Sequence, residues 1–272
     1  VFYTPYMSFP LSKKRKSGFL APGFGSSSRN GIELRTPYYW NIRPEMDATI
    51  TPRVLGDSGV MLMGEYRYLL ERGNGELDIE YLPGDNEFSD QDRNLIHFEH
   101  SQSFLSRGDL FLKYNRVSDK NYLEDFGNSL STTSTRYLER RADVTYGGRG
   151  WNLQARVQDY QTVDRSQLIT SRPYKRLPQI RFNYNSPYRG LRPNYGLKSE
   201  IVYFDRGKDP VLENVNGLRL DLFPSISLPI QTVSSFLKPE LGVRFTQYDL
   251  DNNNIIEDSP SRILPVFSVD SG

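Results

Sequence analysis

The sequence SGFLAPGFGSSSRNGIELRTPYYWNIRPEMDATITPR occupies residues 17–53 and predicts three consecutive strands. Each of these strands carries one proline, at Pro22, Pro37 and Pro52. Proline has no N–H group to give to a strand ladder, so it belongs at a sheet edge, a strand end or a bulge. Because Pro22 and Pro37 fall inside alternating segments of two successive strands, we expect a weak seam at this point.

Beyond this stretch, apolar and polar residues alternate with a period of two, as in Leu153, Ala155 and Val157 against Gln154 and Arg156. Such alternation predicts strands with one apolar and one polar face, and helical spacing is scarcely present. The predicted fold class is therefore all-β and antiparallel, with about 14 strands. The predicted strands lie near residues 17–25, 30–41, 46–55, 59–71, 75–83, 93–105, 109–118, 134–147, 150–162, 178–186, 195–206, 216–228, 236–249 and 261–270.

The connections between these strands alternate in length. Short turns near 71–75 and 147–150 alternate with longer polar segments such as 118–133. Long loops at one end and short turns at the other are expected of a transmembrane β-barrel, whose strands need only about ten residues. Alternation alone also fits a soluble lipid-binding β protein, such as a lipocalin or jelly roll. The long strands, and the aromatic residues near their ends, favour the membrane barrel.

Composition excludes several other classes. With 37% hydrophobic residues and a mean hydropathy of −0.60, the chain has no run that approaches the roughly 20 apolar residues of a spanning helix. A net charge of +1 provides no overall positive potential that would attract nucleic acid. The absence of cysteine excludes disulfides and thiolate metal sites. Both ends fall in strand-like sequence, so we expect the chain to be a piece of a longer protein.

No enzyme is predicted, and no cofactor or metal. His97 and His100 are the two histidines, and a spacing of three on a strand points them to opposite faces, which argues against a shared ion. No nucleophile signature accompanies either of them. The alternative from another class is a smaller outer-membrane barrel that acts as a lipid hydrolase or protease.

Two short motifs remain. Tyr38, Tyr39 and Trp40 place large amphipathic rings where a membrane–water boundary would lie. The run Lys13-Lys14-Arg15-Lys16 concentrates positive charge before the first strand. It is interpreted either as a solvated linker or as a contact for a phosphorylated amphiphile or an anionic partner surface at the membrane boundary.

Eight segments of the chain are recognisable together, and they are residues 2–10, 15–25, 37–42, 46–53, 65–68, 78–83, 212–228 and 262–271. In this order they closely resemble the LptD family of lipopolysaccharide-assembly outer-membrane proteins, also called organic solvent tolerance proteins. The resemblance runs along the whole chain and is most specific in its first third.

The resemblance implies an architecture and a role. Residues 1–16 are expected to be the end of a periplasmic jellyroll and a basic linker, and 17–272 the N-terminal half of a barrel of about 26 strands. We therefore expect an open, curled half-barrel in the Gram-negative cell outer membrane, with the first residues in the periplasm. The family inserts lipopolysaccharide into the outer leaflet through a hydrated lumen and a lateral gate, and its gate prolines match Pro22 and Pro37. The implied partners are lipopolysaccharide, the plug lipoprotein LptE, the periplasmic bridge protein LptA and the bilayer.

Overall fold

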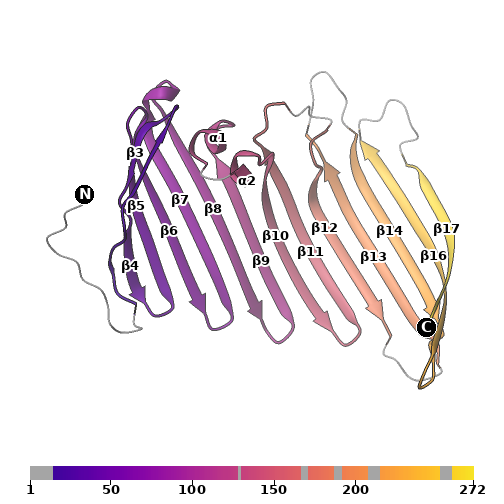
Figure 1. Cartoon of the computed structure of the whole chain (residues 1–272). Coiled ribbons are helices and arrows are strands. Elements are labelled where there is room, and N and C mark those ends of the chain that lie inside the picture. The colour runs from indigo at the N-terminus through magenta and orange to yellow at the C-terminus, as the bar shows by residue number, and fades with distance from the viewer. Residues whose placement is uncertain (1–14, 128–129, 167–170, 187–191, 208–214, 252–258) are drawn as a thin grey trace. The chain divides into compact units, whose positions relative to one another are not determined.

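A computed structural model describes residues 15–127, 130–166, 171–186, 192–207, 215–251 and 259–272. In these residues the chain forms an antiparallel sheet of 17 strands with little helix (Figure 1). The last strand pairs with the strand before it, and no register among the described residues closes the sheet into a barrel. The prediction of an all-β, antiparallel and open sheet is confirmed.

The elements follow one another along the chain, mostly as long hairpins. They are β1 Gly18–Phe19, β2 Gly23–Ser27, β3 Gly31–Arg35, β4 Tyr38–Arg43, β5 Met46–Leu55, β6 Gly59–Leu70, β7 Gly73–Asp85, η1 Asn86–Phe88, β8 Gln91–Phe104, β9 Gly108–Val117, α1 Tyr122–Phe126, α2 Leu130–Thr133, β10 Tyr137–Gly148, β11 Trp151–Thr162, β12 Lys175–Asn185, β13 Asn194–Asp205, β14 Asn216–Ser227, β15 Ile230–Gln231, β16 Phe236–Asp251 and β17 Ser261–Ser271.

The first two predicted strands are each divided. The segment 17–25 becomes β1 and β2, with Pro22 between them, and 30–41 becomes β3 and β4, with Pro37 between them. The expectation of two continuous strands was therefore wrong, because each proline ends a run of ladder hydrogen bonds. These two divisions, and the short strand β15, account for the difference between about 14 predicted strands and 17 observed ones.

A bulge accompanies the first division. Gly18 opposes Tyr39 where β1 pairs with β4, whereas Gly23 opposes Arg35 where β2 pairs with β3. Three residues therefore separate the paired segments on the first strand, and two separate them on the second. This unequal count is the signature of a β-bulge, which bends the strand and interrupts its ladder.

Pro52 behaves differently from the other two prolines. It lies inside the continuous strand β5, opposite Leu62 of β6, and its carbonyl accepts a hydrogen bond of 3.1 Å from the backbone N of Thr36. The ladder on the β6 side stays in one register past this residue. Proline is tolerated here because its carbonyl still pairs, although it gives no N–H.

The chain divides into two compact units, which are described separately. Unit 1 comprises residues 1–100 and 114–135, and unit 2 comprises 101–113 and 136–272. In unit 1, α1 buries apolar side chains together with residues from the strands. The buried apolar residues of unit 1 are Leu55, Met61, Leu82, Val117, Tyr122, Leu123 and Phe126.

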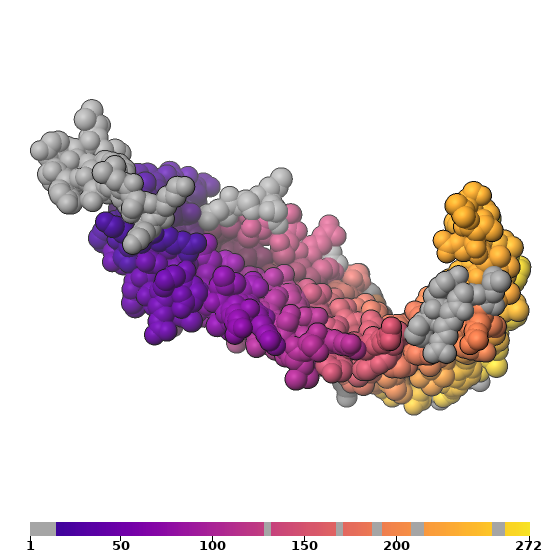
Figure 2. Space-filling model, turned by 90° about the horizontal axis from the view of Figure 1, so that it is seen from below, coloured from indigo at the N-terminus to yellow at the C-terminus, as the bar shows by residue number. Residues whose placement is uncertain are grey.

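Unit 2 consists almost entirely of long hairpins. The registers pair each of its long strands from β10 to β17 with the next long strand in the chain. The space-filling view colours this unit from pink through orange to yellow (Figure 2). Its buried apolar residues among those described are Val163 and Val202, and many apolar side chains of one sheet face are exposed, such as Leu153 and Val243. The opposite face carries the charged residues. One face is thus apolar and exposed, and the other is polar, as the alternation predicted.

Helices α1 and α2 were not predicted. Residues 118–133 do connect two strands, as the sequence interpretation expected, but this connection contains two short helices, at 122–126 and 130–133. Within the residues that the structure describes, no helix has the length and apolar character needed to cross a membrane.

Candidate functional site

The proline seam lies in the first hairpin of unit 1. Between the β1–β4 and β2–β3 pairings, the backbone N of Leu20 donates to the carbonyl of Pro37 at 2.9 Å, and the two prolines donate nothing. β1 contributes only two paired residues, so few ladder hydrogen bonds form on the β1–β4 side of the seam. The structure therefore brings Pro22 and Pro37 to the same break in the ladder.

The three aromatic residues of β4 do not form one cluster. Tyr38 opposes Ile50 and packs edge-on against Phe19, with ring centroids 5.1 Å apart. Trp40 shares that apolar face and is 48% exposed. Tyr39 points to the polar face, where its hydroxyl donates to a carboxylate oxygen of Asp47 at 3.1 Å.

The basic run is described only in part, since Lys13 and Lys14 lie outside the described residues. Lys16 is exposed, whereas Arg15 forms an ion pair of 2.9 Å with Asp47. Arg67 binds the same carboxylate at 2.9 Å, so two guanidinium groups share one acid whose side chain is 6% exposed. An open depression of about 240 Å³ adjoins these residues and Glu45. Arg15, whose side chain is 64% exposed, thus links residue 15 to β5 through Asp47.

A second charged cluster is centred on Arg93 of β8, which sequence reasoning missed. The guanidinium is 2% exposed and meets three aspartates: Asp85 at 2.9 Å, Asp119 at 2.9 Å and Asp125 at 2.8 Å. Asp119 accepts from both Nε and Nη2 of Arg93, a bidentate pairing that fixes the planar group. Aromatic rings cover the remaining guanidinium surface, with Phe88 at 4.4 Å, Phe126 at 4.6 Å and Tyr122 at 5.6 Å from its central carbon.

The acids around Arg93 differ in their electrostatics. Burial acts to raise the pKa of Asp119, but hydrogen bonds from Arg93 and Ser118 outweigh it and hold that pKa below its ordinary value. Burial raises the pKa of Asp125, and its contacts with Arg93 and Arg29 offset only part of this effect. Burial also raises the pKa of the Tyr122 phenol, whose hydroxyl donates to Glu80 at 2.6 Å. The positive charge of Arg93 therefore stabilises three aspartates that are buried or partly buried around it.

A signal for this cluster was present in the sequence. Tyr122, Leu123 and Phe126 are spaced as one face of a helical turn, and Asp119 and Asp125 flank them. The turn is too short to be recognised by periodicity alone. The pairing of Arg93 with residues 26 and 32 positions later depends on the fold.

The two histidines have separate surroundings. His97 Nδ1 lies 2.5 Å from the side-chain oxygen of Asn115, and His100 Nδ1 lies 2.8 Å from the hydroxyl of Tyr68. The His100 ring also stacks on Phe98. In the described part of the chain, no three histidine, cysteine, aspartate or glutamate side chains are grouped closely enough to hold a metal ion.

The polar face of unit 2 carries a ladder of ion pairs. Glu200 of β13 accepts from Gln179 at 2.5 Å and from Arg181 at 2.7 Å on β12, and it also pairs with Arg219 of β14. The ladder continues where Asp221 of β14 pairs with Arg244 of β16 at 3.0 Å. Similar pairs join β10 and β11. Opposite charges on adjacent strands stabilise one register over its neighbours.

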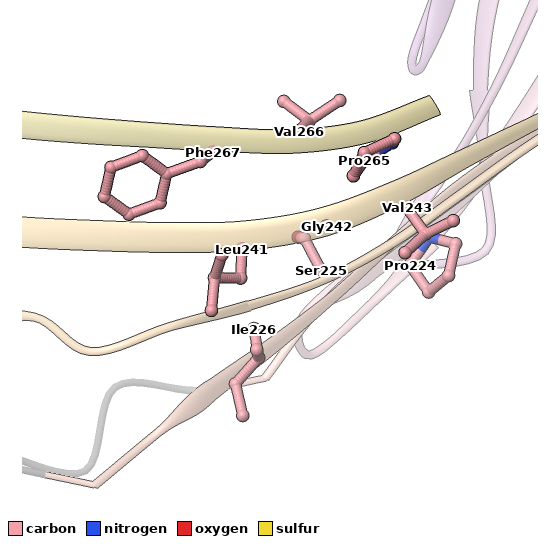
Figure 3. A pocket seen from close by; sticks show the side chains of 9 residues that line it. All are labelled: Pro224, Ser225, Ile226, Leu241, Gly242, Val243, Pro265, Val266 and Phe267. Carbon is pink, nitrogen blue, oxygen red and sulfur yellow. The ribbon is translucent and has the colours of Figure 1, made fainter. Parts of the chain in front are cut away.

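The apolar face of unit 2 contains an open depression of about 690 Å³ (Figure 3). Leu241 and Phe267 are opposed residues of β16 and β17 in its wall, and Pro224 and Pro265 lie farther along it. The depression is part of the exposed apolar face, and none of the residues that line it is charged.

The fold and these clusters define a class of protein: long antiparallel hairpins with one cross-linked polar face and one exposed apolar face, as in strands of a large transmembrane barrel. The family model for LptD, described as LPS transport system D, matches residues 91–272. The chain therefore belongs to the LptD family.

Individual relatives give the extent of the match. The LPS-assembly protein LptD of Nitrosococcus oceani is 46% identical over 273 residues, covering 100% of this chain and 36% of the relative. Those of Alkalilimnicola ehrlichii and Nitrosomonas eutropha are each 39% identical, covering 100% of this chain and 36% and 38% of the relatives. The chain thus spans about a third of the length of the relatives it matches.

Proposed function

We propose that this chain is part of the outer-membrane translocon that inserts lipopolysaccharide into the outer leaflet of a Gram-negative cell. The names of the relatives and the membership in the LptD family support this role. Residues 17–272 would be the N-terminal half of the barrel. Residues 1–16 would be the end of a periplasmic jellyroll with its linker, which places the start of the chain in the periplasm.

The two faces of the sheet suit an amphiphile with a polar head and several acyl chains. The polar face, rich in arginine and acidic pairs, would line a hydrated lumen through which sugars and phosphates pass. The exposed apolar face would lie against the bilayer. Acyl chains would have to leave the lumen sideways, because a hydrated path does not accommodate them.

The break in the ladder at Pro22 and Pro37 is the observation that carries the proposal. A lateral gate needs a seam that opens at low cost, and each backbone hydrogen bond omitted lowers that cost by about 1 kcal/mol net. Both prolines lie between strand segments, where the pairing on one side consists of two residues. They would act by weakening one side of the gate.

The flanking residues would hold this seam at the periplasmic boundary. Tyr38 and Trp40 share the apolar face and would lie among lipid head groups, whereas Tyr39 supports Asp47 on the polar face. Of the basic run, Lys13, Lys14 and Lys16 would be the contacts for lipid A or the boundary. Arg15 would serve mainly to dock the linker, since it already binds Asp47.

The partners follow from the same role. The plug lipoprotein LptE would fill the lumen against the polar face, and the bridge protein LptA would deliver lipopolysaccharide to the jellyroll. The role requires no covalent chemistry and no cofactor, so the chain would act as a conduit and not as an enzyme.

The test replaces Pro22 and Pro37 by alanine in the full-length parent protein. Alanine can donate the missing hydrogen bonds, so newly made lipopolysaccharide should reach the cell surface more slowly. Pro229→Ala is the matched control, because that residue lies in the connection between β14 and β15. An unchanged rate of arrival in the double variant would refute the weak-seam mechanism.

A further inference from the structure

The turn that joins β2 to β3 is attached to the loop that contains α1. Asn30, which is 3% exposed, donates through its side-chain nitrogen to the carbonyl of Asp125 at 2.8 Å. The neighbouring Arg29 forms an ion pair of 2.6 Å with the Asp125 carboxylate. A hairpin tip and a loop about 95 residues later are thus joined by one buried hydrogen bond and one ion pair.

The tip itself is rigidly placed to make these contacts. The side-chain oxygen of Asn30 accepts from the hydroxyl of Ser58 at 3.2 Å, and its backbone N donates to Ser27 Oγ at 3.0 Å. Gly31 has a left-handed conformation with φ of 68°, and an added Cβ would lie 2.6 Å from a carboxylate oxygen of Asp57. Only glycine fits there without strain, so the turn presents Asn30 in a fixed direction.

A second attachment reaches the same loop through β5. Arg53, which is 3% exposed, donates from Nη1 to the carbonyl of Phe126 at 3.3 Å. Its Nε and Nη2 atoms donate to the two carboxylate oxygens of Glu33 on β3, each at 3.0 Å. Strand β3 is therefore connected to the end of α1 through one buried arginine.

Both ends of the loop meet on Arg93. Asp119 at its start and Asp125 near its end bind the same guanidinium, which Asp85 of β7 also contacts. Residues 119–126 are therefore fixed to β7 and β8 by charge, and to the first hairpin through Asn30, Arg29 and Arg53.

We propose that residues 119–126 form a strap that anchors the β2–β3 hairpin to the rest of unit 1, with Arg93 as its fixed point. β1 and β2 are the strands most weakly held by their own ladder, because of the break at Pro22. β3 is also paired with β5, through Glu33, Leu34 and Arg35. The strap adds a second hold at the hairpin tip, which does not pass through the seam. The anchoring is a property of unit 1 alone, whereas its use during gate opening rests on the proposed function.

The test measures backbone hydrogen exchange in β2 and β3 of the full-length parent, folded in lipid and without lipopolysaccharide. Asn30→Ala removes the buried contact, and Asp125→Asn removes the ion pairs of Asp125 with both Arg29 and Arg93. Each should raise the exchange of these amides by about tenfold, because β3 is then held to β5 with fewer side-chain contacts beside its backbone pairing. Glu124→Gln is the matched control, since Glu124 is an exposed acid of the same helix.

Arg29→Gln provides a milder variant, because its side chain is 48% exposed and its loss leaves the buried contacts intact. It should raise exchange in the same amides, by less than Asp125→Asn does. Exchange that stays at the control value in Arg29→Gln and in every folded variant would overturn the strap. A second arm records the arrival of lipopolysaccharide at the surface. Faster exchange with unchanged arrival would keep the strap and reject its role in the gate.

Discussion

In unit 1, the guanidinium of Arg93 is 2% exposed and meets three aspartates, whereas in unit 2 Glu200 meets Arg181 and Arg219, whose side chains are 41% and 30% exposed. The first cluster is covered by aromatic rings and a helix. The second lies open along the polar face. Both arrangements neutralise charge, but only the first removes it from water.

This difference relates to how the strands are held. The hairpins of unit 2 are long, with register shifts only where β12 pairs with β11 and β13 among the described registers. Their backbone ladders therefore specify the fold, and the ion pairs help to fix the register. The first strands of unit 1 are short and interrupted, and a packed loop supplies the missing stability. Unit 1 should therefore depend on single residues to a degree that unit 2 does not.

Arg93→Met should cause the largest loss of stability. It leaves Asp85 buried without its cation and Asp125 with Arg29 alone, and breaking a buried ion pair typically costs about 3–5 kcal/mol. The free energy of unfolding in urea, measured on the full-length parent in detergent micelles, should fall by about this amount. Arg116→Met, at an exposed position of β9, is the control. Equal losses in the two variants would remove the distinction between buried and open clusters.

Asp119→Asn should have the next largest effect and a characteristic pH dependence. The pKa of Asp119 is depressed in the folded protein, so its contribution is present at neutral pH and is lost as the pH falls below about 3.9, the ordinary value for aspartate. The variant should lose about 2 kcal/mol at pH 7, in line with a hydrogen bond to a charged group. Below a pH of about 3.9, the free energy of unfolding of the variant should approach that of the parent.

The measurement is a series of urea titrations from pH 7 down to the acid limit. Glu124→Gln serves again as the control on α1. A constant difference between Asp119→Asn and the parent across the whole series would show that the carboxylate charge is not what matters.

Glu200→Gln should lower the free energy of unfolding by less, about 1–2 kcal/mol. Its arginine partners are partly solvated, and glutamine still accepts one hydrogen bond. The loss should appear in the urea midpoint, with little change in the strand register. Glu240→Gln on β16 offers a comparison, since its lysine partner lies at 3.6 Å. A loss from Glu200→Gln as large as that from Arg93→Met would contradict the open character of the ladder.

Asp221→Asn should have the smallest effect, below about 1 kcal/mol, because the side chain of its partner Arg244 is 53% exposed. Salt screens exposed charges, so the difference from the parent should shrink between roughly 0.1 and 1 M salt. Unfolding measured at both salt concentrations checks this. A difference that persists in high salt would point to the hydrogen bond with Thr246 instead.

The sequence was sufficient to predict the antiparallel sheet, because alternation with a period of two persists over long strands such as β14 and β16. It also indicated the break at Pro22 and Pro37, although not that each strand divides there. The Arg93 cluster was out of reach, because an isolated arginine in a strand carries no record of which aspartates the fold brings to it. Alternation alone places Tyr39 on the face opposite Tyr38 and Trp40, but its partner Asp47 became visible only in the structure, where Tyr39 opposes Thr49.

The bulge in the first strand has a consequence for chain length. Phe19 and Phe24 are five residues apart and would point to opposite sides of a regular strand, yet they oppose Tyr38 and Leu34 on the same apolar face. The bulge absorbs the extra residue and keeps both rings on one face. Removing one residue there would leave two residues on each strand, so the ladder could run on without a bulge and both rings would keep their face. Removing two would leave one residue opposite two, so a bulge would be needed on the second strand instead. Relatives that are one residue shorter at this position should therefore lack the bulge.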